Sequence, residues 1–267
     1  FKKAEHNETH TDSPYHGTGG PQNVAELRSP SALNQMFLQA CAMNGIPYNA
    51  DYNGAEQFGA FMYQVFHKNG ERHSAAKAYI TPHLSRPNLT VKTNTITSQI
   101  LFEDQRAVGV RVLQGGQTQE LRAHKEVIVS AGAFGSPQLL MVSGVGPAAE
   151  LQRHGIPVVH ALEGVGQNLQ DHIDQVQTWR APSSSETFGV SATGTIKVTK
   201  AIGEWKKKRT GLVTSTFAES GAFFRSSPEV ETPDLQLVFV VGIVDDHSRK
   251  MHLGHGFSCH VDVIRPH

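Results

Sequence analysis

The sequence predicts a mixed fold, α/β plus α+β, because strand and helix periodicities both recur along it. Apolar and polar residues alternate at 89–93, 96–100 and 108–112, and 118–123 follows after the turn Gly115-Gly116, which together is the pattern of a β-meander. Helical spacing of apolar residues predicts helices over about 31–44 and 193–209. Later apolar runs predict further strands: about 213–225, 234–244 and 256–264.

The first half of the chain carries one well-marked helix. A cap-like Ser29-Pro30-Ser31 precedes its apolar positions. Asn44-Gly45 favours an end there, and Ile46-Pro47 cannot continue a helix. A second, short helix is expected over about 74–84, before the alternating segments begin.

The segment after the meander changes period several times. Glu126–Val129 has the composition of a buried strand. Two helices are expected next, at about 136–143 and 147–154, and a glycine closes each of them. Ile156–Val159 is then expected to return as a strand.

The composition indicates a globular protein without a strong electrostatic partner. Lys plus Arg number 24 and Asp plus Glu number 24, so the formal net charge is zero and no nucleic-acid partner is expected. One local basic run, Lys206–Arg209, follows Trp205 at the end of an expected helix. Cations favour the helix dipole there, and we prefer this interpretation to a docking patch.

Cysteine content and hydropathy bear on the compartment. Cys41 and Cys259 make no disulfide scaffold and fit a reducing compartment. The longest apolar run, Leu235 to Val244, is about half a membrane span and indicates a buried strand. We therefore expect a cytoplasmic protein, and the sequence leaves open whether it associates with a membrane.

Several blocks of sequence occur in a fixed order along the chain. The most distinctive, Glu126–Gly146, joins a strand ending in small residues, a Ser-Pro helix start and a glycine-closed helix end. The other blocks are His16–Pro21, Gly70–Tyr79, Arg86–Val91, Arg106–Val110 and Gly164–His172. In this order the blocks resemble the glucose–methanol–choline (GMC) oxidoreductases, a family of FAD-dependent alcohol oxidases and dehydrogenases that includes choline dehydrogenase.

The resemblance implies how the chain divides. Residues 72–168 would belong to the FAD-binding domain and contribute the β-meander and the last strand of a doubly wound sheet. Residues 1–71 and 169–267 would belong to the substrate domain, an antiparallel sheet with helices on its outer face. The family's N-terminal GxGxxG loop is not found in this sequence, and its catalytic His would lie beyond residue 267. We therefore expect a central fragment without catalytic residues of its own.

The resemblance also implies the chemistry of the full-length protein. It would oxidise an alcohol, choline-like or other, to an aldehyde or ketone by hydride transfer to N5 of FAD. Two alternatives stay open: a non-redox, lyase-type family member that contains FAD, and an inactive truncated chain that acts only as a structural or binding domain. The electron acceptor, oxygen or a quinone, and the oligomeric state are also left open.

Two places in the chain are candidates for contacts with FAD by this resemblance. Ala131, Gly132 and Ala133 end the expected strand, and small residues at the carboxyl end of a strand leave room for a ribose or phosphates. The family places FAD against this segment. The resemblance also assigns the adenine of FAD to the backbone of Thr97.

A third candidate place follows a Gly-x-Gly turn. Asn168, Asp171 and His172 have family counterparts near the cofactor at the domain junction. A capping or turn role explains Asn168 and Asp171 equally well.

Glu219 is the candidate substrate-binding residue. The block Phe217–Phe224 resembles the strand that faces the active site in choline-oxidising members of the family. A carboxylate there could pair with a quaternary ammonium. The alternative is a solvent-facing charge on a strand, and we favour this alternative.

Two further patterns are not expected to form sites. Gly144–Ala149 fits GxGxxA, but a helix precedes it instead of a strand, and Pro147 lacks an N–H; close packing of two backbones explains its glycines better. The 15 histidines show no metal-ligand spacing, so no metal is expected. The densest group comprises Asp245, Asp246, His247, His252, His255 and His260.

Overall fold

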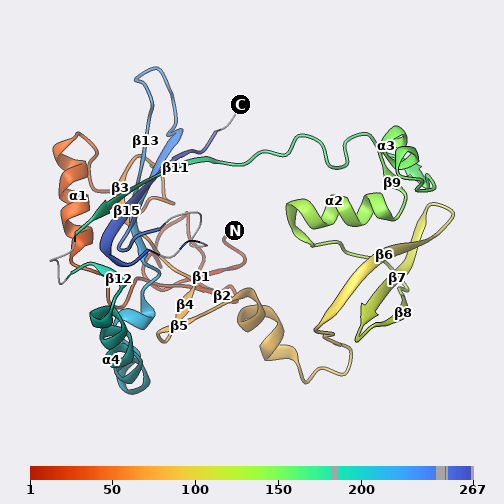
Figure 1. The fold of residues 1–267 in the computed structure, drawn as a ribbon, viewed down its shortest axis with the longest axis horizontal. Helices are drawn as coiled ribbons and strands as arrows, with labels where there is room; N and C mark the ends of the chain where they lie inside the picture. The colour runs from red at the N-terminus through yellow and green to blue at the C-terminus, as the bar shows by residue number, and fades with distance from the viewer. Residues whose placement is uncertain (182–185, 245–249, 251, 266–267) are drawn as a thin grey trace. The chain divides into compact units, whose positions relative to one another are not determined.

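The computed structural model describes residues 1–181, 186–244, 250 and 252–265, and it divides into two compact units (Figure 1). Unit 1 comprises Phe1–Arg86 and His172–His267, and unit 2 comprises Pro87–Asp171. Unit 2 is thus inserted into unit 1 along the sequence. The assignment of residues 72–168 to an FAD-binding domain stays a prediction.

Unit 1 is built on a six-stranded sheet in which all neighbouring strands are antiparallel. Its strands are β3 (Gly59–Met62), β11 (Ile173–Arg180), β12 (Phe188–Val190), β13 (Ala218–Phe224), β14 (Leu235–Val240) and β15 (Gly254–Val263). The order along the sheet is β11-β15-β14-β13-β3, and β12 also pairs with β15. The antiparallel sheet expected from the resemblance is therefore confirmed.

The helices of unit 1 match their sequence signals within two residues. They are α1 (Leu33–Met43) and α4 (Ala192–Lys208), and Ser191 caps α4 by accepting a hydrogen bond from the Gly194 N–H. The apolar face of α1 packs on the sheet through Phe37, Leu38 and Cys41, against Ala60, Ala222 and Leu237. Among the described residues, no helix is both long and apolar enough to cross a lipid bilayer.

The rest of unit 1 is made of short elements. They are the parallel pair β1 (Glu5–Asn7) and β2 (Gln22–Val24), and the hairpin β4 (His67–Lys68) and β5 (Glu71–Arg72). The helix predicted at 74–84 is instead a π-helical turn, Ala76–Ile80, followed by a 3₁₀ turn, Thr81–His83. The Thr81 N–H bonds Ala76 O, and Pro82 cannot donate the next helical hydrogen bond.

Unit 2 contains the predicted β-meander and two helices. The meander is β6 (Thr95–Glu103), β7 (Arg106–Gln114) and β8 (Gln117–Arg122). The helices are α2 (Gly132–Val142) and α3 (Ala148–Arg153). Two short strands form a parallel pair: β9 (Val145–Gly146) lies between the two helices in the sequence, and β10 (His160–Ala161) follows α3. The Ser143 hydroxyl fastens α2 to β6 by accepting the Ile100 N–H at 2.8 Å.

Three strand predictions in unit 2 are wrong, and the first is the alternation at 89–93, which forms no strand. Glu126–Val129 forms no strand, and Ile128 is 78% exposed. Ile156–Val159 also forms no strand; the paired residues, His160 and Ala161, come directly after it. Apolar composition marks a segment that can pair, but a strand also needs a neighbour. None of the described residues pairs with 126–129.

Candidate functional site

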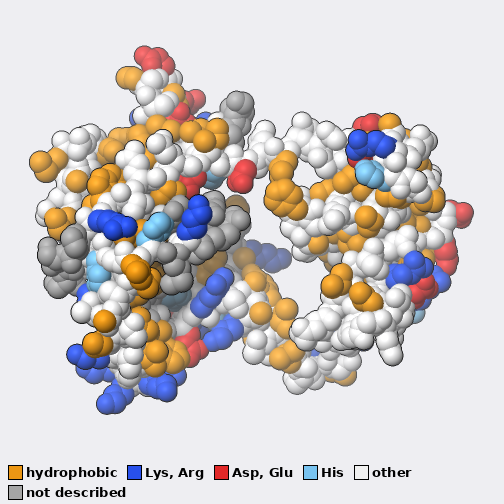
Figure 2. Space-filling model, viewed as in Figure 1, with side chains coloured by type: hydrophobic (Ala, Val, Ile, Leu, Met, Phe, Trp, Pro, Cys, Tyr) orange, Lys and Arg blue, Asp and Glu red, His pale blue; other side chains and the backbone are white. Residues whose placement is uncertain are grey.

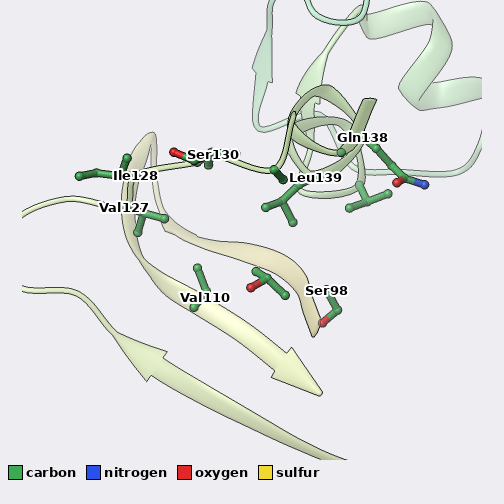
Figure 3. Close-up of a pocket in the computed structure, with 12 residues that line it drawn as sticks. Ser98, Val110, Val127, Ile128, Ser130, Gln138 and Leu139 are labelled. Carbon is green, nitrogen blue, oxygen red and sulfur yellow. The ribbon is translucent and has the colours of Figure 1, made fainter. Parts of the chain in front are cut away.

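Unit 2 contains a cavity of about 530 Å³ between the meander and α2, and this cavity is open to solvent (Figure 3). Thr97 and Ser98 of β6 and Val110 of β7 form one wall, and Gln138 and Leu139 of α2 form another. The segment 127–131 closes one side. Two predicted residues that are distant in sequence, Thr97 and Ala131, therefore line one cavity.

The strand β6 is irregular where it borders the cavity. Thr97 pairs with Val112 and Gln99 with Arg111, so Ser98 is an additional residue between them. The Ser98 hydroxyl donates to Arg111 O at 3.2 Å. Such a bulge turns backbone groups out of the ladder, and it does so here at the position predicted to present backbone to a cofactor.

The beginning of α2 lies at the edge of this cavity. Gly132 has φ +82°, which favours glycine, and a Cβ there would meet no atom within 4 Å. The Ala131 N–H donates to Ser136 Oγ at 3.0 Å, and α2 has neither a side-chain N-cap nor an acidic residue in its first turn. Its first N–H groups and the helix dipole therefore favour an anion such as a phosphate.

The remaining predicted cofactor residues do not line the cavity. Gly132 and Ala133 lie in the first turn of α2 beside it, whereas Asn168 lies in an exposed turn with φ +56°. The boundary between the two units falls between Asp171 and His172, both of which are exposed. The FAD contacts assigned to these residues stay predictions.

Glu219 on β13 is buried, so the solvent-facing interpretation that we favoured is wrong. Its side chain is among the most completely buried, and the residue is 1% exposed. One carboxylate oxygen accepts the Ser31 N–H at 2.7 Å and the Asn34 amide at 2.6 Å, and the other accepts the Ser215 hydroxyl at 2.6 Å. The carboxylate thus joins β13 to the beginning of α1. It also lines a cavity of about 200 Å³, and its contact with substrate stays a prediction.

Sequence reasoning missed a buried ionic group in unit 1. The His16 side chain is 3% exposed and lies between two carboxylates, with Nδ1 2.9 Å from Glu5 Oε1 and Nε2 2.9 Å from Asp51 Oδ1. Burial lowers the pKa of His16, but the hydrogen bonds to Glu5 and Asp51 outweigh it and raise the pKa above its usual value. The His16–Pro21 block marked the histidine; nothing in the spacing indicated its distant partners.

The histidines of the last strand have structural partners. His255 contacts Ser191 Oγ through Nε2 at 2.7 Å, and His260 contacts Asp174 through Nδ1 at 2.8 Å. Asp245, Asp246 and His247 lie outside the described residues. Within the described part of the chain, no three His, Cys, Asp or Glu side chains are grouped as metal ligands.

The GxGxxA segment is a packing feature. Gly144 has φ +89°, and a Cβ on it would lie 2.6 Å from Pro157 O. Its N–H donates to Met141 O, and its carbonyl accepts the Val159 N–H at 2.8 Å. The glycine thus lets two backbone segments approach closely, as expected from the sequence.

Comparison with known proteins gives consistent matches over the whole chain. A family model described as GMC oxidoreductase matches residues 2–174. An alcohol dehydrogenase [acceptor] of Pseudomonas putida is 42% identical over 100% of this chain and 48% of its own length. The mitochondrial choline dehydrogenase of Homo sapiens is 41% identical over 99% of this chain and 44% of its own length. The chain therefore spans about half the length of the curated relatives it matches.

A solved structure supports the fold. It is a formate oxidase of Aspergillus oryzae, described by the effect of a mutation on its FAD modification. It superposes with a TM-score of 0.83 over 100% of this chain and 52% of its own, at 24% identity. At this identity the likeness shows the fold alone, and it confirms the mixed α and β class predicted from the sequence.

Proposed function

The chain belongs to the GMC oxidoreductase family, and on this premise we propose that the full-length protein oxidises an alcohol to an aldehyde or ketone with FAD as its cofactor. The observation that carries the proposal is the cavity of unit 2, where Thr97 and Ala131 lie together beside the beginning of α2. The family resemblance assigns both residues to FAD, although they are far apart in the chain.

The residues around this cavity fit part of an FAD molecule. A volume of about 530 Å³ lies within the ~300–1,000 Å³ range of ligand pockets, and apolar side chains dominate the wall. The bulge at Ser98 would offer backbone groups to a base, and Ala131 and Gly132 would let phosphates or ribose approach the N–H groups of α2. When bound, FAD supplies the hydride acceptor, and the chain supplies position and electrostatics.

The substrate that we propose is an alcohol, with choline as one member to be tested. Relatives named alcohol dehydrogenase and choline dehydrogenase match at nearly equal identity, 42% and 41%. Glu219 enters the proposal as a positioning residue, because its carboxylate is already bonded by Ser31, Asn34 and Ser215. We keep a cytoplasmic location in the proposal, since both cysteines are free thiols.

A visible absorption spectrum of the purified full-length protein tests the cofactor. We expect flavin bands, and we expect them to bleach without oxygen when a suitable primary alcohol or choline is added. Flavin that never bleaches across a broad alcohol panel would support the lyase-type alternative, and no flavin after incubation with FAD would contradict the proposal.

A matched pair of variants tests the cavity itself. Ala131→Phe places a ring in the cavity and should lower FAD content severalfold, whereas Ala149→Phe adds the same ring at an exposed position of α3. Flavin-to-protein absorbance ratios measure both variants. Equal, undiminished FAD content in the two would show that FAD binds elsewhere.

A further inference from the structure

The outward face of α4 combines unpaired positive charge with exposed apolar side chains. The helix carries five lysines and one glutamate, a net charge of +4 (5 − 1): Lys197, Lys200, Lys206, Lys207, Lys208 and Glu204. Gly194 and Ala201 mark the inner face, which is buried. Figure 2 shows Lys and Arg side chains gathered at the C-terminal end of α4, with hydrophobic side chains beside them.

Most of these lysines have no acidic partner. Arg209 is engaged, because it pairs with Glu71 at 2.7 Å and lies 4.1 Å from the centroid of the Trp205 ring. Among the described residues, by contrast, no carboxylate pairs with Lys200, Lys206, Lys207 or Lys208, all of which are exposed. Uncompensated charge concentrated on one helix creates a local positive potential in a chain whose formal net charge is zero.

The helix dipole favours Lys206, Lys207 and Lys208, which lie in the last turn, but it does not account for Lys200 or for the exposed isoleucines. A dipole favours cations in the last turn only, and Arg209 already occupies the C-cap position. Lys200 lies more than two turns before the end of the helix, where the dipole has little effect.

Two isoleucines share the outward side with the lysines. Ile196 is 55% exposed and Ile202 is 43% exposed. Helical spacing places Ile196 one turn from Lys200, and Ile202 one turn from Lys206. Gly203 lies on the same face, and a Cβ added to it would meet no atom within 4 Å. This face of α4 is therefore not covered by other parts of the described structure.

We propose that the outward face of α4 is a docking surface for an anionic lipid membrane. Lipid headgroups would neutralise Lys200, Lys206 and Lys207, while Ile196 and Ile202 enter the boundary between headgroups and acyl chains. An anionic membrane would bind through both features, because interfacial helices bind through basic and apolar side chains together. A nucleic acid or a soluble polyanion would use the lysines and leave both isoleucines in water.

Sedimentation of the full-length protein with vesicles tests the proposal. Binding should be much stronger to vesicles containing phosphatidylserine than to pure phosphatidylcholine, and it should weaken as salt is raised. A combined Lys200→Gln, Lys206→Gln, Lys207→Gln variant should bind about 100-fold more weakly, since each lysine near an anionic surface contributes about fivefold. A separate variant with Ile196→Ser and Ile202→Ser should bind vesicles about tenfold more weakly than the parent, because it removes apolar side chains from the lipid boundary.

The control carries the same charge change elsewhere. Lys68→Gln, Lys92→Gln and Lys125→Gln remove three exposed lysines and should leave vesicle binding within about twofold of the parent. A Lys200→Arg, Lys206→Arg, Lys207→Arg variant keeps the charge and should keep the binding.

Three results would overturn the proposal. The first is equal partition onto neutral and anionic vesicles. The second is equal loss of binding in the α4 triple glutamine variant and its control. The third is binding to heparin or duplex DNA with none to anionic vesicles, which would assign the lysines to a soluble polyanion. None of these readouts depends on bound flavin or on alcohol turnover.

Discussion

Replacing Glu219 with alanine should strongly destabilise unit 1. The substitution removes the acceptor of three hydrogen bonds, from Ser31 N–H, the Asn34 amide and the Ser215 hydroxyl, at 2.6–2.7 Å. The Ser215 hydroxyl can rotate, and Asn34 already donates to Ser31 O, but the Ser31 N–H is fixed in the backbone. One unsatisfied donor, two weakened ones and a small void together cost about 3–5 kcal/mol.

Glu219→Gln distinguishes the effect of losing the side chain's volume from the effect of losing its negative charge. It preserves the volume but replaces one acceptor oxygen with an amide nitrogen, so a loss of about 1–2 kcal/mol is expected. Glu231→Ala is the matched control, because it also removes a carboxylate but at an exposed position, and it should change stability by less than about 0.5 kcal/mol.

Urea unfolding of the full-length protein, followed by tryptophan fluorescence, measures these differences from the transition midpoints and slopes. The expected order of stability is Glu231→Ala, then Glu219→Gln, then Glu219→Ala. A Glu219→Ala variant within about 1 kcal/mol of the Glu231→Ala control would refute the idea that this carboxylate fastens α1 to the sheet.

Two further perturbations test other parts of the structure. His16→Gln should reduce the dependence of stability on pH. In the parent, the pKa of His16 is higher in the folded protein than in the unfolded chain, where it is near 6.5. The free energy of unfolding of the parent should therefore fall as the pH rises from about 6.5 through the raised folded pKa. Urea midpoints measured between pH 5 and 9 test this, with His83→Gln at an exposed position as the control. The reasoning would be contradicted if the midpoint changed with pH equally in His16→Gln, in His83→Gln and in the parent. Gly144→Ala should cost about 2–4 kcal/mol because its Cβ would clash with Pro157 O, whereas Gly155→Ala, also at positive φ but in open space, should cost about 1 kcal/mol. Thermal melts that show equal losses would disprove close packing at Gly144.

Local signals predicted the helices and the meander well. The end of α1 follows from residues that cap or break a helix within a few positions, such as Asn44 and Pro47. The meander follows from alternation that its own neighbouring strands satisfy. These elements need little information from distant parts of the chain.

The errors at 126–129, Glu219 and His16 share one physical origin, which is dependence on distant partners. Residues 126–129 have strand composition but no pairing partner among the described residues. Glu219 is surrounded by residues near position 30, so sequence neighbours on β13 could not reveal its burial. His16 likewise depends on Glu5 and Asp51, and family resemblance located the histidine without its carboxylates.

The pairing of β3 with β13 has a consequence for biosynthesis. Phe61 lies opposite Gly221, and the whole of unit 2 is synthesised between them. At about 5–20 residues per second, a ribosome would need roughly ten seconds or more to deliver β13 after β3 has emerged. During that time Ala60 and the apolar face of α1 have no sheet to cover, so we expect the nascent segment 33–62 to expose its apolar side chains until β13 emerges. Unit 2, whose meander pairs strands that are adjacent in sequence, can fold while unit 1 is still incomplete.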